Sequence, residues 1–66
     1  MNSPYRVTSS SGHFVGVDNK QGAINLAISH CQHRQEDTEV LELDSNGVYD
    51  LIDAFAFSNG QVINWL

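Results

Sequence analysis

Three short segments that each end in glycine constrain the fold of this chain more than any other feature. They are Ser10-Ser11-Gly12, Ser45-Asn46-Gly47 and Ser58-Asn59-Gly60, and each lies between stretches of β-favouring residues. A three-residue hairpin loop is commonly a type I turn followed by a residue in the left-handed region, which glycine adopts without steric cost. The spacing therefore predicts three β-hairpins.

The apolar pattern around the second segment predicts the length of its loop. With a three-residue loop Leu41 opposes Leu51 and Leu43 opposes Tyr49, so apolar side chains meet on one face. A two-residue loop would instead place Leu43 opposite Asp50, because a one-residue slip turns a strand's side chains to the other face. We therefore expect the three-residue loop.

Five strands follow from these loops, with ends uncertain by two to four residues. We expect them at about 4–9, 13–17, 39–44, 48–57 and 61–66. The same three-residue loop pairs Val7 with Val15 in the first hairpin and Phe55 with Ile63 in the third. Residues 47–57 also fit a helical stripe through Val48, Leu51, Ile52 and Phe55, but the alternating Ala54-Phe55-Ala56-Phe57 favours a strand.

One helix is predicted between the second and third strands. Asp18 can accept the free N–H groups at its start, and Gln21 completes a spacing like that of a capping box. Arg34 lies in its last turn, where positive charge complements the helix dipole. Its apolar stripe consists of Ile24, Ala27, Ile28 and Cys31. The chain is thus predicted to be a single α+β domain (1–66) of order β-β-α-β-β-β, with one helix packed on one face of an antiparallel sheet.

This sheet is apolar on both faces, although one helix can cover only one of them. The side chains expected under the helix are Leu41, Leu43, Tyr49, Leu51, Phe55, Phe57, Ile63 and Trp65. Those expected on the uncovered face are Val40, Val48, Ile52, Ala54, Ala56, Val62 and Leu66. Exposed apolar surface of roughly several hundred Å² usually marks an interface. We therefore expect a homodimer, or a docked partner protein, on Val40, Val48, Ile52, Ala54, Val62 and Leu66; the alternative is a twisted sheet whose back is partly covered by the first hairpin.

Asp53 does not fit this pattern. The register places it on the helix-facing side between Leu51 and Phe55, where an unpaired carboxylate is costly. We expect a β-bulge near residue 53 that turns Asp53 outward, and the alternative is a functional buried acid.

The charge of the chain limits the classes of partner that it can bind. Three basic residues face eight acidic ones, for a net charge of −5, so the chain lacks the cations that direct nucleic-acid binding needs. Seven of the eight acids lie between residues 36 and 53, where they would attract a basic protein surface. The predicted contacts are Glu36, Asp37, Glu39, Glu42, Asp44 and Asp50; the alternative is a solvated acidic surface.

No cofactor, metal or catalytic site is predicted. His30, Cys31 and His33 are the only cluster of metal-ligand types, with His13 as a distant third imidazole, whereas structural zinc needs four ligands. Cys31 belongs to the apolar stripe, so we expect an inert buried thiol. Glu42 and Asp50 are predicted cross-strand neighbours on an open sheet face, which provides no cleft for acid–base catalysis.

No secretory signal, no membrane-spanning run and a single cysteine predict a cytoplasmic protein without membrane contact.

The order of elements resembles that of small inhibitor proteins of the anti-CRISPR type, which phages and mobile elements encode. The resemblance lies in the helix from Ala23 to Cys31 and in the run from Val40 through Asn46-Gly47 to Trp65. It implies a non-enzymatic acidic module that docks on a basic, nucleic-acid-contacting surface of a host protein complex. The alternative is a small homo-oligomeric structural or assembly protein that associates through an apolar sheet face.

Overall fold

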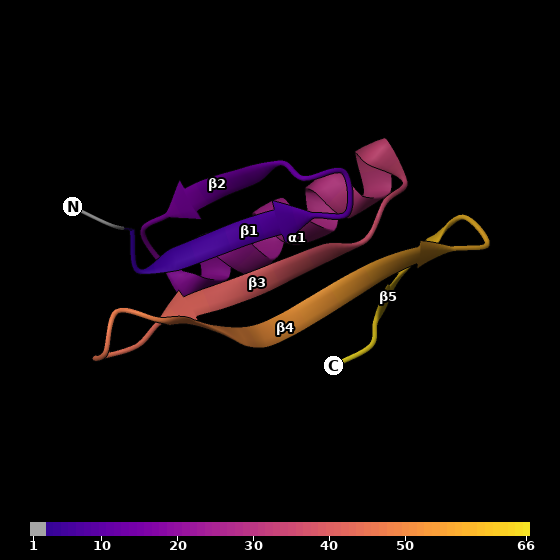
Figure 1. The fold of residues 1–66 in the computed structure, drawn as a ribbon. Helices are drawn as coiled ribbons and strands as arrows, with labels where there is room; N and C mark the ends of the chain where they lie inside the picture. The colour runs from indigo at the N-terminus through magenta and orange to yellow at the C-terminus, as the bar shows by residue number, and fades with distance from the viewer. Residues whose placement is uncertain (1–2) are drawn as a thin grey trace.

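The computed structural model describes residues 3–66, which form five strands and one helix. In chain order these are β1 (Tyr5–Ser9), β2 (Phe14–Val17), α1 (Lys20–Arg34), β3 (Thr38–Leu43), β4 (Tyr49–Ser58) and β5 (Gln61–Asn64). The strands form one antiparallel sheet of order β2-β1-β3-β4-β5. Figure 1 shows α1 behind β1 and β3, and no element of residues 3–66 in front of them. The predicted α+β fold is confirmed, and most of residues 47–57 belong to a strand rather than a second helix.

The loops of the first two hairpins have three residues, as predicted. The expected pairs Val7–Val15, Leu41–Leu51 and Leu43–Tyr49 all occur. Gly12 and Gly47, the last residues of the two loops, have φ angles of 93° and 81°. Residues with a Cβ rarely adopt these angles, so glycine at these positions allows the loop.

The third hairpin has a two-residue loop, and its predicted register is wrong. Phe55 pairs with Asn64 rather than with Ile63. Asn59 and Gly60 have φ angles of 52° and 77°, and a type I′ turn requires positive φ at both central residues. Because the loop is one residue shorter than expected, Ile63 lies on the opposite face of the sheet from Phe55.

Asn19 caps the start of α1, one residue later than predicted. Its side-chain Oδ1 accepts a hydrogen bond from the Gly22 N–H at 2.7 Å, which satisfies one of the free donors of the first turn. The helix ends at Arg34, and the C-cap residue Gln35 has its backbone in the left-handed region at φ 56° and ψ 44°.

The helix packs on the sheet through small side chains. Ala23, Ala27 and Cys31 are fully buried, and the predicted Ile24 and Ile28 flank them partly buried. Small side chains along this line let the helix lie close to Val7, Val40 and Phe55 of the sheet, which complete the core.

A buried hydrogen bond joins the helix to β3. The Thr38 hydroxyl donates to the Ala27 carbonyl oxygen at 2.9 Å, and Thr38 is fully buried. This bond satisfies the one polar side chain among the buried residues of the described chain, and it places Thr38 and Val40 on the helix-facing side of β3.

β4 contains a bulge beside Asp53, as predicted. Leu51 pairs with Leu41 and Asp53 pairs with Val40, so Ile52 is an extra residue in the ladder. An extra residue reverses the alternation of side chains beyond it. The first half of β4 therefore presents Leu51 away from the helix, whereas the second half presents Phe55 towards it.

Asp53 is half-buried and has hydrogen-bond donors, rather than being turned fully to solvent. Its Oδ1 accepts from the Asn64 side-chain amide at 2.6 Å and from the Ala54 N–H at 3.0 Å. Asp53 pairs with the buried, helix-facing Val40, so the bulge does not turn it outward and that part of the prediction is wrong.

The prediction of which residues the helix covers is partly wrong. Leu41, Leu43, Tyr49, Leu51, Ile63 and Trp65 lie on the face away from α1, because of the bulge and the shorter third loop. Of the residues expected on the uncovered face, Val40 and Ala54 are fully buried, Ile52 and Val62 pack against the core, and Val48 and Leu66 are exposed. Val40 and Ala54 are therefore inaccessible to a partner, and Ile52 and Val62 are only partly accessible.

Two phenylalanines offer a matched test of this arrangement. Phe55 is 4% exposed in the core and Phe14 is 67% exposed on β2. We expect Phe55→Ala to lower the free energy of unfolding by about 3–5 kcal/mol, and Phe14→Ala to lower it by less than about 1 kcal/mol. Urea denaturation measures both, and equal losses would contradict the described core.

Candidate functional site

The sheet leaves one apolar face uncovered (Figure 1). Leu51, Ile63 and Trp65 are 42%, 45% and 52% exposed there. We define the open face as Phe14, Leu41, Leu43, Tyr49, Leu51, Ile63 and Trp65, which all lie on the side away from α1. The sequence predicted that such a face would exist, but assigned it to other residues.

One cation, Arg6, lies against the aromatic rings of the open face. Its guanidinium carbon is 4.1 Å from the ring centroid of Tyr49 and 5.0 Å from that of Phe14. The Tyr49 hydroxyl in turn donates to the Ser3 carbonyl oxygen at 2.6 Å. Exposed cation–π contacts contribute about 0.5–1 kcal/mol each, so Arg6 links β1, β2 and β4 across this face.

Three of the predicted contact acids converge where β3 turns into β4. Glu42 and Asp50 are directly opposed, and Asp44 starts the loop between them. A hydrogen bond with Asp44, followed by desolvation and the charges of Asp44 and Glu42, raises the pKa of Asp50. We call Glu42, Asp44 and Asp50 the acidic end. Their mutual repulsion opposes ionisation of the three groups together.

Two of these acids also hold the structure locally. Asp44 Oδ1 accepts from the Asn46 N–H at 2.8 Å and the Val48 N–H at 3.0 Å, and the Val48 bond is the main reason that the pKa of Asp44 is lowered. Glu42 accepts from the Tyr5 hydroxyl at 3.1 Å. Within residues 3–66 the contact between an acid and a basic side chain that is close enough for an ion pair joins Glu36 and His30, so no lysine or arginine of this part of the chain is paired with the acidic end.

The other three predicted contact acids lie elsewhere. Glu39 pairs with Thr8 on the side of the sheet away from α1, Asp37 is exposed before β3, and Glu36 is bonded within the chain. The structure therefore brings together half of the predicted set and separates the rest.

A hydrogen-bonded cluster that the sequence did not predict joins the first loop to the end of the helix. Glu36 Oε1 lies 2.6 Å from His30 Nε2 and accepts from the Ser11 hydroxyl at 2.8 Å. The Ser11 hydroxyl lies 2.9 Å from His13 Nδ1 and 3.0 Å from the Ser9 hydroxyl. These bonds, that of His30 above all, lower the pKa of Glu36. Ser9, Ser11 and His13 are close in sequence, but His30 on α1 and Glu36 after it are distant. The sequence therefore could not show that these residues meet.

This cluster does not have the geometry of a nucleophile. Ser11 donates its proton to Glu36 rather than to an imidazole base, which triad-type activation would require. The His13 and His30 rings lie 6.4 Å apart, but among residues 3–66 no three ligand-type side chains gather into a metal site. Burial, and then the charge of Asp37, raise the pKa of the Cys31 thiol, which disfavours the reactive thiolate.

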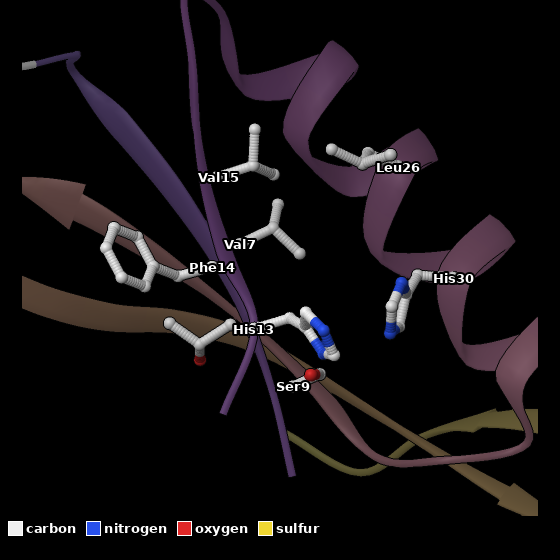
Figure 2. Close-up of a pocket in the computed structure, with 8 residues that line it drawn as sticks. Val7, Ser9, His13, Phe14, Val15, Leu26 and His30 are labelled. Atoms are coloured by element: carbon white, nitrogen blue, oxygen red, sulfur yellow. The ribbon is translucent and has the colours of Figure 1, made fainter. Parts of the chain in front are cut away.

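An apolar groove with a volume of about 240 Å³ lies between β2 and α1, beside the cluster. Val7, Val15 and Leu26 point into it, and the His13 and His30 rings face one another at one end (Figure 2). Phe14 points away from this space. The helix covers β1 and β3 but stands apart from β2, which leaves Val15 and Leu26 exposed.

No helix of residues 3–66 has both the length and the apolar character needed to cross a membrane. Comparison of the chain with family models, curated proteins and solved structures gave no match.

The Glu36 cluster predicts a pH-dependent contribution to stability. Because the folded-state pKa of Glu36 is below its ordinary value of 4.5, its stabilisation is complete above that value and is lost as the pH falls through the lowered pKa. We expect Glu36→Gln to lower the melting temperature at neutral pH and to have little effect in strong acid. Asp37→Asn, which removes an exposed neighbouring charge without these bonds, is the control. An equal effect of Glu36→Gln at both pH values would contradict the prediction.

Proposed function

We propose that this chain is a non-enzymatic binding module whose acidic end docks on a basic surface of a protein partner. The observation that carries the proposal is the convergence of Glu42, Asp44 and Asp50 at one hairpin, without a cation of residues 3–66 in an ion pair with them. Like charges this close destabilise the free chain, and lysine or arginine side chains of a partner would relieve the repulsion.

The overall charge supports the same kind of partner. With a net charge of −5 the chain is attracted to positive surfaces and repelled by phosphate backbones. The resemblance to anti-CRISPR-type inhibitors extends the proposal to a host complex whose basic surface otherwise contacts nucleic acid. The carboxylates of the acidic end would there occupy positions that phosphates take.

A neutral triple variant, Glu42→Gln with Asp44→Asn and Asp50→Asn, tests this proposal. The amide oxygens retain acceptors for the Tyr5 hydroxyl and for the N–H groups of the turn. We expect the variant to lose at least about tenfold in affinity for a basic partner captured by the parent chain, and the salt dependence of binding to flatten. Affinity capture from host lysate followed by titration at several salt concentrations measures both.

Stability provides the control for this experiment. The raised pKa of Asp50 means that its favourable contribution is present at low pH and lost as the pH rises through the folded-state value. Neutralising Asp50 should therefore raise the melting temperature at neutral pH, whereas replacing Asp44, whose pKa the Val48 N–H lowers, should reduce it. Binding is therefore compared well below the measured melting temperatures of both chains, so that lost binding does not reflect unfolding. A parent and a variant that capture the same proteins with equal affinity would overturn the proposal.

The open face favours a second candidate function, a small homo-oligomeric structural protein. Leu51, Ile63 and Trp65 expose apolar surface that a second copy would bury. If this face associates, Leu51→Lys should yield a monomer, whereas Val48→Lys, at a more exposed aliphatic position just before β4, should leave the oligomer unchanged. Light scattering behind a sizing column across concentrations distinguishes these outcomes, and a parent chain that is monomeric throughout would exclude this function.

A further inference from the structure

We propose that the outer edge of β2, together with the groove between β2 and α1, binds an extended peptide segment of a partner protein. The segment would add to the sheet as a further strand beside β2. This surface does not include the acidic end and shares only Phe14 with the open face, so the inference does not depend on the proposed function.

The backbone of β2 is available for pairing. β2 is an edge strand in the order β2-β1-β3-β4-β5. The Ser9 N–H donates to the His13 carbonyl oxygen at 2.9 Å, so His13 and Val15 direct their backbone groups towards β1. Since these directions alternate along an antiparallel strand, Phe14 and Gly16 direct their N–H and C=O groups away from β1.

β2 is short, with four residues, but otherwise lacks the features that usually protect a sheet edge. Residues Phe14–Val17 include no charged residue and no proline, and their register with β1 shows no bulge. Such an edge is a template for another strand, and strand addition to an open edge is a recurring mode of peptide recognition.

The groove provides space for side chains of the added strand. Strands lie about 4.8 Å apart, so alternate side chains of a strand outside β2 would extend towards α1 beside Val15 and Leu26. These two side chains line the 240 Å³ groove, and the apolar surface that they expose there is not covered by the described chain. Figure 2 shows them, with Val7, directed into the same space. The polar end of the groove is already bonded, since His30 pairs with Glu36.

Charge indicates which peptide would fit. The chain carries a net charge of −5, and the exposed Asp18 directly follows β2 while Glu36 lies at the other end of the groove. A second copy would bring the same negative charge, which disfavours self-pairing at this edge. The side chains that alternate with the apolar ones would lie on the side of Phe14, whose ring already contacts Arg6. The net charge and Asp18, rather than this ring, favour basic residues in the segment. The occupant is therefore a segment in which apolar residues alternate with lysine or arginine.

A displayed library of random octapeptides, selected on the folded chain, tests this inference. We expect enrichment of peptides that alternate apolar and basic residues and contain no acidic ones. Two pairs of variants then locate their site. Phe14→Pro removes the outward N–H at the first residue of an edge strand, a position that proline tolerates, and Phe14→Ala removes the ring alone. Leu26→Lys places a charge on the groove wall, and Ser29→Lys adds the same charge on an exposed part of the same helix.

We expect Phe14→Pro to weaken peptide binding at least about tenfold more than Phe14→Ala, because a backbone hydrogen bond is lost and its acceptor is left unpaired. Leu26→Lys should abolish binding, while Ser29→Lys should change it little. Circular dichroism confirms that each variant is folded. The inference would be overturned if no peptide or only acidic peptides were enriched. Equal effects within each pair of variants would also overturn it. So would a dimer of the parent chain that Phe14→Pro dissociates, because the edge would then bind a second copy.

Discussion

The arrangement of both sheet faces depends on one extra residue in β4. The bulge at Ile52 and Asp53 turns Phe55 towards α1 while Leu51, four residues earlier, faces away from it. In a regular strand these residues would share a face, and one helix of fifteen residues would have to cover both ends of the longest strand. The bulge instead gives the helix a compact group to cover. The apolar side chains of the other half are then left on the open face.

The close approach of the helix to the sheet also leaves apolar surface exposed, in this case beside β2. Ala23, Ala27 and Cys31 let α1 lie near Val7 and Val40, and the Thr38–Ala27 hydrogen bond holds it there. A helix centred on β1 and β3 does not reach over β2, so the groove beside Val15 remains unfilled. In a chain this small, tight packing at the centre leaves apolar surface at the edges. The surfaces available for binding are thus consequences of how the core is built.

The sequence predicted the elements better than it predicted their faces. Glycine-ended loops and helical spacing depend on neighbouring residues, so the strands, the helix and two registers followed from local chemistry. Asn59-Gly60 supports two loop lengths, and the choice between them depends on pairing along the whole of β4 and β5. The acidic end was predictable because Glu42 and Asp50 flank one loop. The Glu36 cluster was not, because His30 and Ser11 meet only after the helix has packed on the sheet.

The single cysteine lies at the centre of this packing, so its reactivity reports how often the helix separates from the sheet. Cys31 is fully buried against the sheet, and no second thiol competes with it. A thiol reagent can reach its sulfur only while α1 is lifted from β1 and β3, so the rate of modification equals the frequency of that opening when the open form reacts faster than it recloses. The lifetime of the helix–sheet contact is therefore readable in the unmodified chain, without a label that would itself disturb so small a core.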